Sequence, residues 1–194
     1  GKDKVGFVTM PSQHTSYETF FDANEFFTRN KITNFNNINI NQIYDSVLAH
    51  LQDLFLGKEA DITEENIQSR IRGLLIMALS NKFQKLVITT GNKSEVAVGY
   101  STLYGDTCGA FSLIKDIYKT QVFSLAKWRN RNIPKLSIAK LVNPIPDNII
   151  NKEPTAELRD GQKDSDSLPD YQLLDKILYH LIEMRSTADS FSAN

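Results

Sequence analysis

Three polar side chains stand where they could bind a charged ligand. Glu95 comes a few residues after an apolar, β-branched run at 86–89, and its carboxylate could ligate a hard cation through oxygen. Lys119 lies beyond a Tyr-Gly-Asp turn near the expected start of a helix, where its ammonium group could neutralise phosphate oxygens. Thr155, in the segment Glu-Pro-Thr-Ala-Glu, could donate a hydrogen bond to a phosphate. Each has an ordinary alternative, because Glu and Lys are common on surfaces and Thr after Pro often only caps a helix.

The residues at 85–90 predict where such a ligand would lie. Within them an apolar, β-branched run at 86–89 is followed by a break at Gly91 and Asn92, which is typical of a buried strand that ends in a charged loop at 93–95. In open α/β sheets, ligands bind in the crevice beyond the carboxyl ends of the strands. Thr90 ends the expected strand, so its backbone and hydroxyl should lie at this edge.

A second candidate face belongs to a helix expected at 63–81, with Thr63 as its N-cap and acidic residues in its first turn. Asn66 and Arg70 lie one turn apart on it and could hold an anion together. Gly73 on the same face costs about 1 kcal/mol relative to Ala in a helix interior, which is easier to understand if something packs closely there. An exposed Arg on a solvated face beside an incidental Gly is the alternative. The expected core stripe of this helix is Ile67, Ile71, Leu74, Leu75 and Leu79.

The elements that must position these residues alternate between strands and helices. This alternation favours an α/β fold with a mostly parallel sheet covered by helices on both faces. Trp128 is expected to anchor the helix that contains it. The expected strands are at 5–10, 38–40 and 86–89, and the expected helices are near 20–27, at 41–57, at 63–81, from 122 to before 133, and at 173–182.

A long connection at 143–169 carries four of the six prolines, and an acidic, Ser-rich stretch lies at 160–170. Loops of this length in a compact domain are usually functional or disordered. We therefore treat residues 160–170 as a candidate lid that closes over a bound ligand.

The composition limits the function classes. The chain has 194 residues, enough for one domain with a sizeable core, and its 22 basic and 23 acidic residues give a net charge of −1. This balance offers no electrostatic case for nucleic acid or an anionic membrane as partner. A single cysteine, Cys108, and three scattered histidines make a zinc site or a Cys-His nucleophile an unattractive hypothesis, whereas oxygen ligands and Mg²⁺ remain open. We expect a cytoplasmic location, since no signal-like start or long apolar run is present.

Four segments resemble segments of the NAD synthetase family, and they occur in the same order and at the same spacing as in that family. Leu103 and Ala110 stand where the ammonia-dependent enzymes commonly have Lys and Asp, so this sequence is more similar to the glutamine-dependent branch. The resemblance extends to about Ile182. The segments are VTMPSQHTS at 8–16, ENIQSRIRG at 65–73, TTGNKSEVAVGYSTLYGDTCGAFSLIKDIYKTQ at 89–121 and KEPTAELRDGQKDSDSLPDYQLLD at 152–175.

The resemblance implies an enzyme of the ATP pyrophosphatase type, with the three-layer α/β/α, adenine-nucleotide α-hydrolase-like fold. Such enzymes use ATP and Mg²⁺ to adenylate the nicotinate carboxylate of deamido-NAD, and ammonia derived from glutamine then gives NAD. A homodimer or larger homo-oligomer is also implied. By position, the resemblance makes Thr90, Lys119 and Thr155 ATP contacts, Lys119 and Glu95 catalytic, Glu95 the Mg²⁺ ligand, and Asn66, Arg70 and Glu95 the deamido-NAD contacts.

Some family features are not found in these residues. The phosphate-binding loop Ser-Gly-Gly-x-Asp-Ser should precede Val5, and Gln13 and His14 replace an Arg-Tyr pair. Cys108 is not the nucleophile of a glutaminase. We therefore expect an N-terminally truncated, partial synthetase domain at 1–185 with a polar tail at 186–194, inactive alone. The alternatives are a nucleotide-binding or assembly fragment without catalysis, and a related ATP pyrophosphatase such as GMP synthetase.

Overall fold

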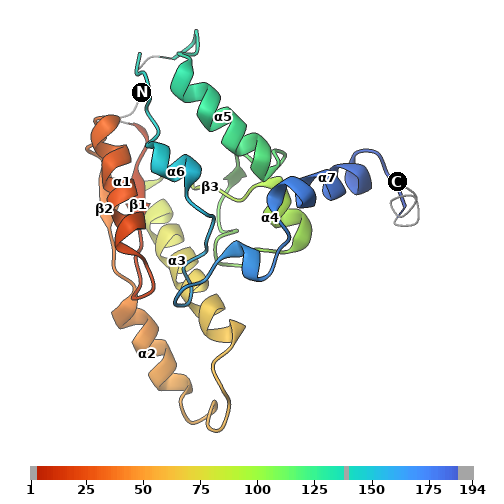
Figure 1. Cartoon of the computed structure of the whole chain (residues 1–194). Coiled ribbons are helices and arrows are strands. Elements are labelled where there is room, and N and C mark those ends of the chain that lie inside the picture. The colour runs from red at the N-terminus through yellow and green to blue at the C-terminus, as the bar shows by residue number, and fades with distance from the viewer. Residues whose placement is uncertain (1–3, 138–139, 188–194) are drawn as a thin grey trace.

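The computed structural model describes residues 4–137 and 140–187 of the chain. Within these residues helices predominate, and the strands are only two or three residues long (Figure 1). No described helix combines the length and the apolar composition that a membrane span needs. The helices are α1 (Tyr17–Arg29), α2 (Asn41–Leu51), α3 (Ile62–Phe83), α4 (Lys93–Val98), α5 (Lys119–Arg131), α6 (Asp147–Asn151) and α7 (Tyr171–Ile182), with a short 3-10 helix at Asp164–Asp166.

The strands form two parallel pairs. β1 (Phe7–Thr9) pairs with β2 (Phe35–Asn37), and β3 (Ile88–Thr89) pairs with β4 (Phe111–Ser112). Parallel neighbours require a crossover connection, and α1 supplies it for the first pair. The predicted α/β class with parallel strands is therefore confirmed, and in the described residues the strands form two separate two-stranded sheets.

Aromatic side chains fasten α1 to the first strand pair. The ring of Phe27 stacks on that of Phe35 with centroids 4.6 Å apart and lies 5.5 Å from that of Phe7. Such pairs contribute about 0.5–1.5 kcal/mol beyond the burial of their area. The strand predicted at 38–40 is wrong in position, because β2 ends at Asn37. Ile38 and Ile40 still donate backbone hydrogen bonds to the carbonyl oxygens of Thr9 and Pro11, and Ile40 is the fully buried N-cap of α2.

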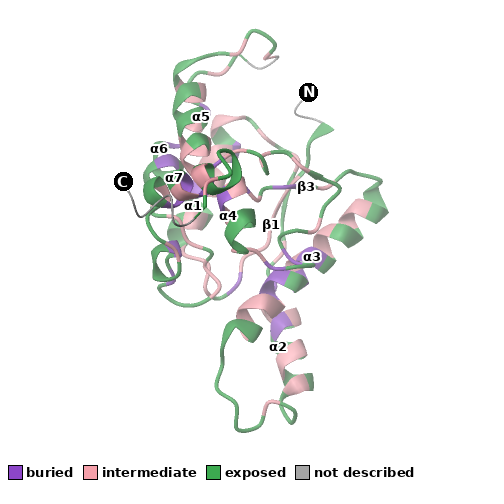
Figure 2. Cartoon of the chain, turned by 90° about the vertical axis from the view of Figure 1, so that its right-hand side faces the viewer, coloured by how far each residue is buried: buried purple, intermediate pink, exposed green. Residues whose placement is uncertain are grey.

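Helix α2 and the first part of α3 form an arm that projects from the rest of the molecule (Figures 1 and 2). Ile40, Tyr44 and Ile71 are buried where the two helices meet. The N-cap of α3 is Asp61, not the predicted Thr63. The Asp61 carboxylate accepts a hydrogen bond from the Thr63 N–H at 2.7 Å, and Glu64 completes a capping box by accepting one from the Asp61 N–H. Two further interior predictions are wrong, since Leu74 on α3 is 66% exposed and Trp128 on α5 is 50% exposed.

The segment after β3 is a helix, not the predicted charged loop. Asn92 accepts a hydrogen bond from the Glu95 N–H at 3.0 Å, and the Glu95 carboxylate accepts one from the Asn92 N–H at 3.1 Å. This reciprocal capping begins α4, which Gly99 ends with a positive φ of 72°. The strand before it is also less buried than predicted, because Ile88 is exposed and Thr89 alone of its two residues is buried.

Helices α4, α5 and α7 pack around a second apolar cluster. Tyr118, immediately before α5, is buried against Leu174 and Leu178 of α7, with Leu168 and Tyr171 alongside. The buried residues in this part of the molecule lie where the three helices meet (Figure 2). This packing brings the starts of α4 and α5 together.

Gly73 allows a loop to lie directly on α3, as its position in the sequence predicts. A Cβ at residue 73 would lie 2.4 Å from the Tyr104 carbonyl oxygen, and one at Gly105 would lie 2.3 Å from the Ser69 hydroxyl oxygen. The Tyr104 oxygen is a backbone atom and cannot move aside as the end of a flexible side chain can. The two backbones can therefore lie this close because residues 73 and 105 have no side chain.

Gly73→Ala should therefore lower stability, although the same change in an open helix would raise it. We expect a loss of about 1–3 kcal/mol in the free energy of unfolding, from overpacking against backbone. Urea denaturation measures it, with Ala78→Gly on the exposed side of α3 as a control that should lose about 1 kcal/mol from helix propensity alone. A stability gain for Gly73→Ala would contradict the close approach.

Candidate functional site

Lys119 and Glu95, which are 24 residues apart in sequence, form an ion pair. Lys119 Nζ lies 2.8 Å from Glu95 Oε1, and both side chains are about four-fifths buried. Glu95 is held from its other side by the Asn92 N–H, and Lys119 is the first residue of α5. The structure thus brings both predicted catalytic residues together, and each is fixed by the start of a helix.

The ring of Tyr171 on α7 supports the Lys119 ammonium group, with Nζ 5.2 Å from the ring centroid. The Tyr171 hydroxyl donates a hydrogen bond to Asp164 at 2.7 Å. Burial, and then this bond to a carboxylate, raise the pKa of Tyr171 above its usual value. The phenol therefore stays neutral, and its face remains available to a cation.

A cavity of about 440 Å³ opens beside the ion pair. Lys119, Thr155 and Lys152 line it, so the two predicted phosphate contacts share one cavity with a second lysine. Phe123 and Ile149 supply apolar wall. The lining also contains the carboxylates of Asp22, Glu153 and Glu157, so the two lysines and the hydroxyl offer phosphate contacts within a cavity of mixed charge.

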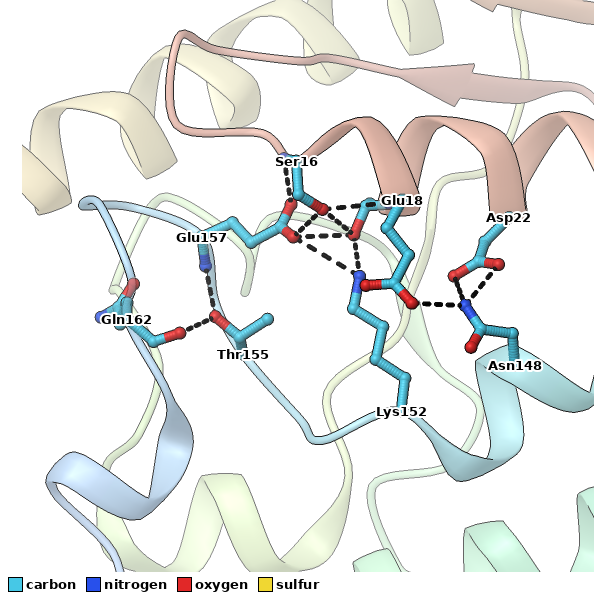
Figure 3. Close-up of polar contacts among 9 residues, drawn as sticks. Ser16, Glu18, Asp22, Asn148, Lys152, Thr155, Glu157 and Gln162 are labelled. Carbon is cyan, nitrogen blue, oxygen red and sulfur yellow. Dashed lines mark hydrogen bonds and ion pairs between the residues drawn. The ribbon is translucent and has the colours of Figure 1, made fainter.

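A carboxylate network closes the side of this cavity formed by α1 (Figure 3). Glu157 accepts hydrogen bonds from the hydroxyls of Ser16 at 2.7 Å and Thr19 at 2.8 Å. Lys152 donates to the Thr19 hydroxyl and lies 3.5 Å from Glu157. The loop that follows α6 is thereby tied to the start of α1.

Opposing effects set the charge state of Glu157. Burial alone would raise its pKa, but the hydrogen bonds from Ser16 and Thr19, together with Lys152, outweigh burial and hold the pKa of Glu157 below its usual value. The carboxylate is therefore ionised at neutral pH and compensates the charge of Lys152.

Thr155 has a structural task in this state. Its hydroxyl donates to the Gln162 carbonyl oxygen at 2.5 Å and accepts from the Glu157 N–H at 3.2 Å. These bonds shape the turn between Thr155 and Gln162, as Figure 3 shows. A phosphate contact from this hydroxyl requires an exchange of hydrogen-bond partner.

The remaining predicted residues lie outside this cavity's lining. Asn66 accepts a hydrogen bond from the Thr102 hydroxyl at 2.7 Å, and Arg70 Nε donates to the Leu103 carbonyl oxygen at 3.3 Å. The structure therefore brings these two residues together against the loop after α4. Thr90 is an exposed residue directly after β3.

A Mg²⁺ ion would need ligands beyond Glu95. No three His, Cys, Asp or Glu side chains gather as a metal-binding group in residues 4–137 and 140–187. Mg²⁺ commonly binds through one or two carboxylates together with substrate phosphates and water. The Glu95 carboxylate, next to a lysine that lines a cavity with a hydroxyl and a second lysine, fits this mode of binding.

The candidate lid at 160–170 is packed down in this structure. Asp164 is buried under Tyr171, Arg159 Nη1 lies 2.8 Å from Glu65 Oε1 on α3, and His14 Nδ1 lies 2.6 Å from Asp160 Oδ1. These contacts define one position of the segment. Closure over a ligand stays a prediction.

A family model described as NAD synthase matches residues 1–194. The chain belongs to the NAD synthase family. Among curated relatives, it is 50% identical over 183 residues to a glutamine-dependent NAD(+) synthetase of Thermotoga maritima and 51% identical over 183 residues to one of Acinetobacter baylyi. Each match covers 94% of this chain but 30% and 32% of the respective relative, so the chain spans about a third of their length.

Solved structures share the fold of this NAD synthase chain. A glutamine-dependent NAD+ synthetase from Acinetobacter baumannii in complex with ADP has a TM-score of 0.71 and 42% identity, over 100% of this chain and 32% of that one. An NMN synthetase from Francisella tularensis has a TM-score of 0.74 and 28% identity, over 88% of this chain and 64% of that one. The NAD synthase chain therefore has the α/β nucleotide-binding fold of these proteins.

Several residues at this cavity and around the ion pair were not predicted from the sequence. Lys152 and Glu157 lie in the segment that contains Thr155. Their charges, on either side of the Pro-Thr pair, were the signal by which the sequence could have indicated them. Tyr171 and Asp175 had no such signal, because the contact of Tyr171 with Lys119 and that of Asp175 with Thr120 join residues more than 50 positions apart.

The Glu157 network predicts an acid-dependent loss of stability. Because the folded-state pKa of Glu157 is depressed, its contribution is present at neutral pH and is lost as pH falls through that pKa, below about 4.5. Glu157→Gln should lower the free energy of unfolding by about 1–2 kcal/mol at pH 7.

Urea denaturation from pH 7 to pH 3 measures this effect. The difference between the original chain and Glu157→Gln should shrink at the acid end, whereas Glu59→Gln, at an exposed position between α2 and α3, should show little difference at any pH. A difference for Glu157→Gln that is constant across this range would mean that the carboxylate's charge has no part in the network.

Proposed function

We propose that this chain forms the ATP-dependent amidating site of a glutamine-dependent NAD synthetase. The observation that carries the proposal is the shared cavity of Lys119, Lys152 and Thr155 beside the Lys119–Glu95 pair, in a chain about 50% identical to curated synthetases. The reaction is the conversion of deamido-NAD to NAD. The nicotinate carboxylate is adenylated by ATP, pyrophosphate leaves, and ammonia displaces AMP.

The chemistry explains why lysines gather here. A carboxylate is a poor electrophile until it carries a good leaving group, and transfer of the adenylyl group places negative charge on the departing pyrophosphate. Lys119 and Lys152 are placed to compensate that charge, and the apolar wall with Phe123 helps exclude water from the reactive adenylate. The role of Lys119 is thus strongest in the transition state.

We assign the ATP contacts to Thr90, Lys119 and Thr155, and the Mg²⁺ ligand to Glu95. Bound Mg²⁺ would neutralise phosphate charge next to the lysines. The ADP complex of the Acinetobacter baumannii relative supports an adenine nucleotide as ligand. Thr155 then exchanges its bond to Gln162 for one to a phosphate oxygen.

Deamido-NAD is assigned to Asn66, Arg70 and Glu95. The first two already hold the loop at 102–103, so substrate binding and loop position are coupled on this face of α3. Glu95 is assigned both to the metal and to the reacting end of deamido-NAD.

Further features of the proposal follow the family. The nitrogen comes from glutamine through ammonia, the protein works as a homodimer or larger homo-oligomer, and the cytoplasm supplies ATP and suits a chain with one cysteine. The domain is proposed at 1–185. Most of the tail proposed at 186–194 lies outside the described residues.

A second candidate function is nucleotide binding or assembly without catalysis. The observation that favours it is that Lys119 and Thr155 line one cavity, which a nucleotide could occupy whether or not a reaction follows. Isothermal titration of ATP, ADP and deamido-NAD against this polypeptide tests it, and absence of binding by all three would exclude the nucleotide-binding form. The family match over residues 1–194 favours NAD synthase over GMP synthetase.

Lys119→Ala in the full-length protein should lower kcat by about 10²–10³-fold while the KM for ATP changes much less, because the lost interaction forms mainly in the transition state. Steady-state assays with deamido-NAD, ATP and either glutamine or ammonia measure both values. Lys127→Ala, at an exposed position of the same helix, should leave both unchanged.

Glu95→Gln should raise the Mg²⁺ concentration needed for half-maximal NAD formation, since a neutral amide binds a hard cation more weakly. Titration of Mg²⁺ at saturating ATP measures this value. If both Glu95→Gln and Lys119→Ala keep full activity at low Mg²⁺, the assignment of the site is wrong. Turnover of nicotinate mononucleotide in place of deamido-NAD would instead indicate the reaction of an NMN synthetase.

A further inference from the structure

The buried carboxylate of Asp175 on α7 does not line the cavity. It is hydrogen-bonded to Ser94 and Thr120, the sequence neighbours of Glu95 and Lys119. Asp175 is 6% exposed, and its neighbour Ser94 on α4 is 0% exposed. Buried carboxylates are rare unless their oxygens are hydrogen-bonded. The contacts of these two residues therefore need an explanation.

All of these contacts lead to the start of α5. Asp175 Oδ1 accepts a hydrogen bond from the Ser94 hydroxyl at 2.5 Å, and Asp175 Oδ2 accepts one from the Thr120 N–H at 2.8 Å. The Ser94 oxygen in turn accepts from the Lys119 N–H at 2.8 Å. Side chains from α4 and α7 thus satisfy the first two N–H groups of α5, which have no partner within their own helix.

This arrangement holds both members of the ion pair through one carboxylate. Ser94 directly precedes Glu95 in α4, and the backbone of Lys119 begins α5. Asp175 joins the two helix starts, so the 2.8 Å separation of Lys119 Nζ from Glu95 Oε1 depends on it. Tyr171, four residues before Asp175 on α7, contributes the ring beneath the Lys119 ammonium group.

We propose that Asp175, acting through Ser94, is a positioning residue that sets the place of Lys119 in the amidating site. This rests on the proposed function of Lys119. A displacement of about 1 Å at a reacting group can cost about 100-fold in rate even when the substituted residue touches no substrate. The C-terminal helix α7 then serves the chemistry as well as the core.

Asp175→Asn and Ser94→Ala, each in the full-length protein, test the proposal by kinetics. Asn presents an amide N–H where one of the carboxylate oxygens accepts a bond, and Ala removes the hydroxyl that links Asp175 to Lys119. Each change should lower kcat about tenfold or more and alter the KM for ATP by less than about threefold, as expected for a disturbed transition-state contact.

The decisive comparison repeats both changes in the Lys119→Ala background. If Asp175 and Ser94 act through Lys119, neither change lowers kcat further once that side chain is gone. Equal losses in both backgrounds, or no loss in the original background, would overturn the proposal. Ser94→Ala keeps the test open if Asp175→Asn fails to fold.

Two controls separate a positioning role from loss of stability and from failure of the proposed function. Val47→Ala in the α2–α3 cluster should lower stability without changing kcat. A similar fall in kcat for this variant would assign the effect to stability and overturn the positioning role. If Lys119→Ala alone keeps full kcat, the proposed function of Lys119 has failed, and the positioning role fails with it.

Discussion

The contact between Lys119 and Glu95 organises the part of the molecule where chemistry is expected. It joins the starts of α4 and α5 at 2.8 Å, and neither residue reaches it without help from elsewhere in the chain. Asn92 and the capping bonds of α4 fix the carboxylate, whereas Ser94 and Asp175 fix the backbone of the lysine. A partly buried ion pair is costly to desolvate unless its geometry is well defined, and these hydrogen bonds define it.

The opposite side of the cavity follows the same principle. Glu157, Lys152 and the hydroxyls of Ser16 and Thr19 compensate one another and tie the loop after α6 to α1. Two lysines can therefore face one cavity because each has a carboxylate partner. A polyphosphate that binds here would replace local partners of these groups, such as the Gln162 carbonyl oxygen that the Thr155 hydroxyl contacts.

Local patterns made much of this predictable. Apolar periodicity located α2, α3 and α7, the position of Gly73 indicated a close approach, and the motif segments indicated Lys119, Thr155 and Glu95. The six-residue helix α4 was missed because it is too short for periodicity, and its signal was the Asn92–Glu95 capping pair. Contacts across many residues could not be predicted: Asp175 lies 81 positions after Ser94, and no spacing rule connects them. Burial of Leu74 and Trp128 failed for a related reason, since periodicity gives a face but not what covers it.

The proposed route activates the nicotinate carboxylate by adenylation, and transfer of an oxygen isotope from that carboxylate to AMP would report it. Deamido-NAD would be prepared with the heavy isotope of oxygen in its nicotinate carboxylate and incubated with the full-length protein, ATP, Mg²⁺ and ammonia. In adenylation, one carboxylate oxygen bonds to the α-phosphorus of ATP and leaves with AMP when ammonia attacks. We therefore expect one labelled oxygen in AMP for each NAD formed. NAD formation with unlabelled AMP, or no NAD from deamido-NAD at all, would contradict it.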